Sequence, residues 1–125
     1  DGRLGTALKG VDEMIDTLRT ELGPVWAKSL VLVATEFGRT VHVNGTRGTD
    51  HGTASAAMLF GGGLDDGGKI VTDWPGLGAS QLYEGRDLKP TMRFESMVIA
   101  ALSSHYGIDP ERLRRTVFPD FPAMN

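Results

Sequence analysis

The most constraining feature of this sequence is SLVLVAT at residues 29–35, an uninterrupted run of strand-forming residues. Because polar and apolar side chains do not alternate, a strand built from this run would be apolar on both faces. A second run, SAAMLFGGG at residues 55–63, reads the same way and ends in glycine. Strands of this kind belong to parallel sheets that are covered by helices. We therefore expect an α/β fold with three layers, in which helices lie on both faces of a mainly parallel sheet.

Two long helices are expected to flank this sheet. Apolar residues recur every three or four positions over residues 4–22, and Gly23-Pro24 ends that helix. The second helix is predicted over residues 91–106, where an apolar face recurs at helical spacing. Thr91 is its expected N-cap, and Gly107 is the glycine expected just beyond its C-terminus.

Three shorter elements are predicted between and after these helices. Asp66-Gly67-Gly68 predicts a turn, which a short strand at Lys69–Thr72 would follow. The segment LYEGRDLKP predicts a small hairpin with Glu84-Gly85 at its tip. Asp109-Pro110 predicts a short final helix with the proline at its first position.

Composition narrows the class of protein. With 125 residues, 40% of them hydrophobic and 23% charged, the chain suits one globular domain or a large piece of one. The net charge is -3 and no block of Lys or Arg occurs, so a nucleic-acid partner is not expected. Without cysteine there are no disulfides or thiolate metal ligands. No apolar stretch approaches the roughly 20 residues of a membrane span, and the first residues show neither an initiator Met nor a signal peptide.

Four residues after the first run carry metal-binding or acid–base chemistry, namely Glu36, His42, Asp50 and His51. Carboxylate and imidazole groups bind zinc and harder divalent ions. A buried strand would place Glu36 at the carboxyl edge of the sheet, where ligands bind in open α/β folds. The adjacent Asp50 and His51 would offer two donors from one loop, or Asp50 would orient the imidazole.

Each of these residues also has a structural interpretation. Glu36 would need water, a metal or an arginine to satisfy its charge at the end of an apolar strand. Arg39, three residues further on, could supply that partner in an internal salt bridge. Asp50 could cap its own turn, which would leave His51 exposed to solvent. The pattern of residues leaves both readings open.

The order of the motifs VLVATEFGRT, NGTRGTDHG, MLFGGGLDDGGKIVTDWPGL, GRDLKPTMRFESMVIAAL and VFPDF resembles an uncharacterised bacterial family, domain of unknown function 1501. The resemblance runs from about Asp12 onward and matches the C-terminal part of that family. It implies membership of the alkaline phosphatase-like superfamily, whose enzymes hydrolyse phosphate and sulfate esters with divalent metals. It also implies twin-arginine export, and therefore a periplasmic or exported location.

The superfamily pattern implies roles for particular residues. Glu36 would be a metal-binding carboxylate, His51 the later histidine ligand, and Asp50 its neighbour or a further ligand of zinc, manganese or magnesium. Arg39 and His42 would contact the anionic ester substrate. Phe37 stands where the superfamily has a histidine ligand, which removes a donor from one metal position unless Asp50 or His42 replaces it.

Two functions follow from the resemblance. In the first, residues 1–125 are a single α/β domain or the C-terminal portion of a larger metal-dependent hydrolase, whose nucleophile has no match here. In the second, the fold is kept without catalysis, as a binding or envelope-structural protein, and Phe37 favours this reading. If part of the sheet lies outside the chain, an exposed strand edge predicts pairing with a second copy.

Overall fold

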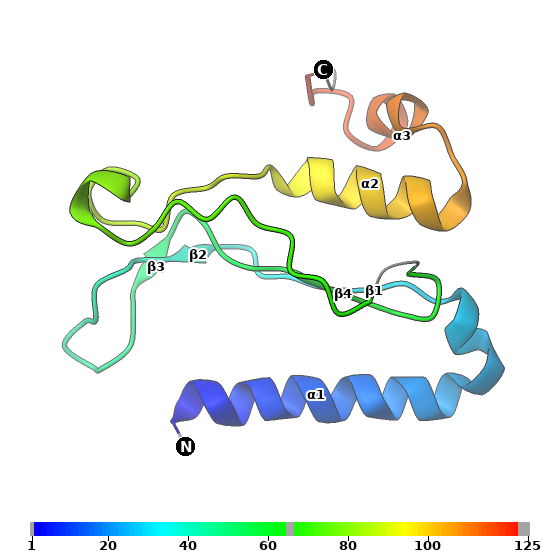
Figure 1. The fold of residues 1–125 in the computed structure, drawn as a ribbon, viewed down its shortest axis with the longest axis horizontal. Helices are drawn as coiled ribbons and strands as arrows, with labels where there is room; N and C mark the ends of the chain where they lie inside the picture. The colour runs from blue at the N-terminus through cyan, green and yellow to red at the C-terminus, as the bar shows by residue number, and fades with distance from the viewer. Residues whose placement is uncertain (1, 65–66, 123–125) are drawn as a thin grey trace. The chain divides into compact units, whose positions relative to one another are not determined.

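The computed structural model describes residues 2–64 and 67–122 (Figure 1). In chain order the elements are α1 (Arg3–Leu22), η1 (Gly23–Lys28), β1 (Val31–Val33), β2 (Gly38–Arg39), β3 (His51–Gly52), β4 (Met58–Phe60), η2 (Ala79–Gln81), α2 (Phe94–Tyr106) and α3 (Pro110–Val117). They divide into two compact units, one of Asp1–Val33 with Met58–Lys69 and the other of Ala34–Ala57 with Ile70–Asn125.

The first unit contains α1, η1 and the β1–β4 pair. The apolar stripe predicted over residues 4–22 does form one helix, and Gly23 ends it with a positive φ of 51° that favours glycine. Pro24 then lies in the first turn of η1, where its missing N–H is not needed. The backbone N–H of Gly62 donates to the carbonyl of Trp26 at 3.0 Å, which ties the turn after β4 to η1.

The two apolar runs pair with each other, but in the opposite sense to the expected one. β1 and β4 are antiparallel, with Leu32 opposite Leu59, and each contributes only three residues. The described residues form two two-stranded antiparallel sheets, so the predicted three-layer, mainly parallel sheet is wrong. A parallel pair needs a crossover, usually a helix, whereas residues 34–57 between β1 and β4 contain only the short strands β2 and β3.

Within the described residues, β1 and β4 form a sheet of two strands. Neither strand has a second partner strand among the described residues. Leu32 in the middle of β1 keeps 38% of its surface exposed, so the run is not enclosed on both faces. Unpaired strand edges suit association, and the predicted pairing with a second copy stays a prediction.

In the second unit, β2 pairs with β3 and a turn closes beside them. Thr40, just after β2, bridges to Asp87, and both residues are buried. The predicted hairpin is confirmed, because Tyr83 bridges to Asp87 and Glu84 and Gly85 both have positive φ, at 51° and 66°. Positive φ at both central residues is the signature of the tightest hairpin turns.

The same unit ends in α2 and α3, which pack against each other. Gly107 follows α2 in the left-handed conformation, as predicted, but the N-cap is Arg93 and not Thr91. Asp109 caps α3 by accepting a hydrogen bond from the backbone N–H of Arg112 at 2.8 Å. Ile99 of α2 is the most completely buried large side chain of the described residues, with 1% of its surface exposed.

The remaining short strand is not formed. Residues 69–72 have no regular structure, and Ile70 has 90% of its surface exposed. Asp66 of the predicted turn lies outside the described ranges. Among the helices of residues 2–64 and 67–122, none combines the length and the apolar character that crossing a bilayer requires.

Candidate functional site

The β2–β3 pair brings two candidate residues, Arg39 and His51, together in the second unit. Arg39 and His51 are direct partners in this antiparallel register, so their side chains lie on the same face of the ladder. Backbone bonds extend the pairing on both sides, from Arg39 N–H to the carbonyl of Ala54 at 3.0 Å and from Thr40 N–H to the carbonyl of Asp50 at 3.1 Å. Both side chains are exposed, which leaves them accessible to a ligand.

Phe37 joins these two residues into a cluster. Its ring stacks on the imidazole of His51, with ring centroids 3.8 Å apart and an angle of 26° between the planes. The guanidinium carbon of Arg39 lies 5.4 Å from the centre of the Phe37 ring, within the range of a cation–π contact. Nη1 of Arg39 also donates to the carbonyl of Thr49 at 3.0 Å. The salt bridge between Glu36 and Arg39 that the sequence allowed is absent from the described residues.

Asp50 belongs to a hydrogen-bonded loop built around Asn44. The Asn44 Oδ1 accepts from the backbone N–H groups of Thr46 and Gly48, both at 3.0 Å, and from the Thr46 hydroxyl at 2.8 Å. Its Nδ2 donates to the Asp50 carboxylate at 2.8 Å. The backbone N–H of Asp50 donates to the Thr40 hydroxyl at 3.0 Å, which ties the loop to the end of β2. Asp50 is therefore partly satisfied by the loop itself.

Glu36 and His42 lie apart from these networks. Both are exposed, and within the described ranges neither side chain has a hydrogen bond or an ion pair. Glu36 was expected at the end of a rigid strand, but β1 ends at Val33 and Glu36 sits in a bend that belongs to the second unit. Its position is thus set by a loop.

The predicted metal ligands Glu36, Asp50 and His51 are not gathered at one point. Across residues 2–64 and 67–122, no three His, Asp or Glu side chains lie close enough together to hold a metal ion. The donors as arranged do not fit zinc, manganese or magnesium, each of which needs several ligands around it. Metal binding by these residues stays a prediction.

Asp87 is a structural residue of this region that sequence reasoning missed. Its buried carboxylate accepts from the Thr53 hydroxyl at 2.8 Å and from Nε of Arg86 at 2.7 Å. The hydrogen bond from Thr53, followed by that from Arg86, holds the pKa of Asp87 below its usual value. Thr53 lies 34 positions from Asp87 in the chain, so no local pattern could have joined them.

Comparison with known proteins identifies a family. The model of a family described as "Protein of unknown function (DUF1501)" matches residues 1–117. No curated protein and no solved structure matches the chain. The match does not extend to the alkaline phosphatase-like superfamily or to any activity.

Proposed function

Because this chain belongs to the DUF1501 family, whose function is unknown, we propose, from the resemblance described above and from the exposed Arg39–His51 pair, that it forms part of a phosphate- or sulfate-ester hydrolase. Arg39 and His51 would contact the anionic group of the substrate. The observation that carries this proposal is their direct pairing across β2 and β3. Two exposed nitrogen-bearing side chains on one face of a short ladder provide neighbouring hydrogen-bond donors for an oxyanion.

The state of the Arg39 guanidinium supports the proposal. Arg39 has no carboxylate partner among the described residues, so its positive charge is not neutralised within that part of the chain. Its bond to the Thr49 carbonyl uses one N–H and limits the motion of the group. The remaining N–H groups are left for an external anion, and the planar fork of arginine matches phosphate and sulfate oxygens.

We assign no chemical step to this cluster. The zinc, manganese or magnesium implied by the resemblance would supply charge stabilisation, but the described donors do not converge, and no nucleophile is identified. The roles of Glu36 and Asp50 as ligands, of His42 as a substrate contact, and the periplasmic or exported location remain proposals from the resemblance.

A second candidate function rests on the Phe37–His51 stack. Because the Phe37 ring covers one face of the imidazole at 3.8 Å, His51 has a packing partner as well as a free edge. A non-catalytic protein that binds an anionic partner, for example at the cell envelope, would need only the cationic and aromatic surface. This reading requires no metal.

Titration with inorganic phosphate and inorganic sulfate, followed through the amide resonances of residues 37–52, tests the anion site. We expect saturable shifts in the native protein and binding weaker by about tenfold in Arg39→Gln, since a charge-assisted contact is lost. Arg19→Gln is the matched control, because Arg19 is exposed on α1 in the other unit. Equal binding by Arg39→Gln and the native protein would remove the assignment.

Turnover separates the two candidate functions. Hydrolysis of 4-nitrophenyl phosphate or 4-nitrophenyl sulfate that falls in Arg39→Gln supports the enzyme. Because the nucleophile has no match in residues 1–125, the assay uses the full-length protein, and anion binding there without turnover, in the presence of added zinc, manganese or magnesium, supports the binding protein.

A further inference from the structure

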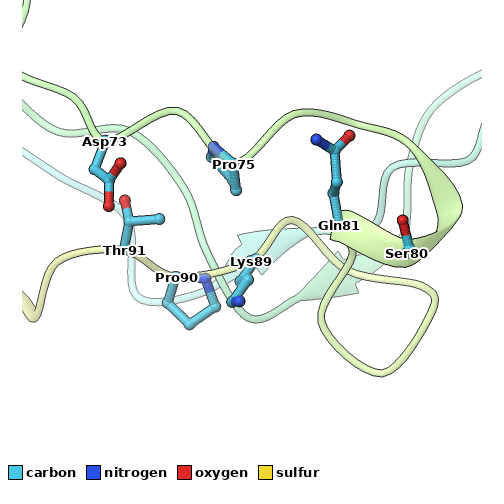
Figure 2. Close-up of a pocket in the computed structure, with 7 residues that line it drawn as sticks. All are labelled: Asp73, Pro75, Ser80, Gln81, Lys89, Pro90 and Thr91. Carbon is cyan, nitrogen blue, oxygen red and sulfur yellow. The ribbon is translucent and has the colours of Figure 1, made fainter.

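A pocket of about 400 Å³ lies in the second unit, lined by Asp73, Pro75, Ser80, Gln81, Lys89, Pro90 and Thr91 (Figure 2). Its lining comes from two stretches of chain, residues 73–81 on one side and residues 89–91 on the other. Neither stretch contributes to the Arg39–His51 pair. The volume falls toward the small end of the range found for ligand pockets, which suits a small molecule.

Each stretch that lines the pocket is held by a hydrogen bond. On one side the Gln81 side chain accepts a hydrogen bond from the backbone N–H of Gly78 at 2.8 Å, which closes the loop around η2. On the other side the N–H of Leu88, next to Lys89, donates to the carbonyl of Arg39 in β2 at 3.3 Å. The first stretch is therefore held by a hydrogen bond within its own loop, and the second by a hydrogen bond to β2.

The lining contains one negatively charged and one positively charged side chain, which do not form an ion pair with each other. Asp73 and Lys89 both line the pocket, yet no ion pair joins them. Within the described ranges neither side chain has another hydrogen bond or ion pair. The lining thus includes one exposed carboxylate side chain and one exposed ammonium side chain that are not paired within the described residues.

This combination excludes several classes of ligand. A phosphate or sulfate group would meet a single cation and a repelling carboxylate. A divalent metal ion would find only one carboxylate, fewer ligands than such ions require. A wholly apolar ligand would leave both charges to be desolvated without a partner, which is unfavourable. A molecule that carries one ammonium group and one carboxylate group satisfies both side chains together.

The neutral part of the lining bears on the uncharged part of the ligand. Figure 2 shows Pro75 extending from one stretch toward the other stretch, which carries Lys89 and Pro90. The two proline rings give the pocket apolar surface, and the amide nitrogen of Gln81 is left to donate because its oxygen holds Gly78. We propose that this pocket binds a free amino acid with an aliphatic side chain, its ammonium on Asp73 and its carboxylate on Lys89.

The probe is L-leucine, followed through the amide resonances of residues 73–81 and 89–91 in the native protein. Two truncated ligands are compared with it, 4-methylpentanoate, which lacks the ammonium group, and 3-methylbutylamine, which lacks the carboxylate. We expect saturable shifts with L-leucine and binding at least about tenfold weaker with each truncated ligand, because each loses one charge-assisted contact. No saturable shift with L-leucine, or undiminished binding of either truncated ligand, overturns the proposal.

Variants test the same assignment from the protein side. Asp73→Asn and Lys89→Gln should each weaken leucine binding by about tenfold, while the double exchange Asp73→Lys with Lys89→Asp should restore it in the reversed orientation. Asp16→Asn and Lys28→Gln, exposed residues of the other unit, are the controls and should bind as the native protein does. Equal weakening by the controls, or no recovery in the double exchange, would contradict binding by this charge pair.

Discussion

Replacing Gly38 by alanine is expected to open the β2–β3 pair on which the Arg39–His51 cluster depends. A Cβ atom at Gly38 would lie 2.2 Å from the carbonyl oxygen of Ala54 and 2.3 Å from its backbone nitrogen. Real Cβ contacts are almost never below 3.0 Å, so the two segments must separate by at least 0.8 Å, the difference between 3.0 and 2.2 Å. The obstacle is backbone, which cannot rotate away as a side chain could.

The separation removes a specific hydrogen bond. Arg39 N–H donates to the Ala54 carbonyl at 3.0 Å, and an added 0.8 Å takes this distance beyond hydrogen-bond length. Losing the bond is worth about 1 kcal/mol, and forcing a methyl group into a closed contact adds about 1–3 kcal/mol. We therefore expect Gly38→Ala to lower the free energy of opening of this pair by about 2–4 kcal/mol.

Amide hydrogen exchange at Arg39 measures this local opening directly. A loss of 2 kcal/mol corresponds to a fall of about 30-fold in protection. Gly45→Ala is the matched control, because a Cβ there meets nothing within 4 Å and Gly45 has no positive φ. If Arg39 is protected equally in Gly38→Ala and Gly45→Ala, the close approach of Gly38 to Ala54 does not hold the pair together.

Three further predictions concern other parts of the chain. Because the Thr53 hydroxyl is the largest cause of the lowered pKa of Asp87, Thr53→Val should raise that pKa toward its usual 3.8, as a carboxyl NMR titration would record. The stability that Asp87 contributes is present above that value and is lost as the pH falls through its folded-state pKa. The free energy of unfolding of Thr53→Val should therefore be lower than that of the native protein at neutral pH and equal to it in strong acid. Gly10→Ala should stabilise α1 by about 0.5–1 kcal/mol, since a Cβ there meets nothing within 4 Å, and an unchanged thermal midpoint would contradict this. Stoichiometric zinc or manganese in the native protein, lost in His51→Ala, is what the resemblance predicts, and elemental analysis that finds no metal would remove that site.

The helices were predictable because their signals are local. Apolar spacing over residues 4–22, with Gly23-Pro24 directly after it, defines both the extent and the end of α1. Gly107 marks the end of α2 through its left-handed conformation, and Asp109-Pro110 marks the start of α3. Thr91 failed as an N-cap because α2 begins only at Phe94, directly after an extended Arg93, and no short motif in the sequence distinguishes these positions.

The sheet and the site were less predictable because they depend on pairing between distant residues. An apolar run at residues 29–35 indicates a strand with two apolar faces, but it does not say which strand pairs with it or in which direction. The Phe37–His51 stack and the Thr53–Asp87 bond likewise join residues that share no local pattern. The sequence identified Arg39 and His51 as candidate residues, while their placement side by side depends on the register of β2 and β3.

The hydrogen bonds of Asn44 also bear on the chemical ageing of this chain. Asparagine followed by glycine deamidates readily when the next backbone nitrogen attacks the side-chain amide, and Asn44 precedes Gly45. In the closed loop the side-chain amide of Asn44 is held by hydrogen bonds to Thr46, Gly48 and Asp50, which oppose the rotation that the attack requires. Deamidation would replace the side-chain NH2 group of Asn44, which donates to the Asp50 carboxylate, by a negatively charged oxygen. Two carboxylates would then repel each other where a hydrogen bond existed. The loop therefore protects the bond that keeps it closed, and each opening of the loop exposes Asn44 to irreversible damage.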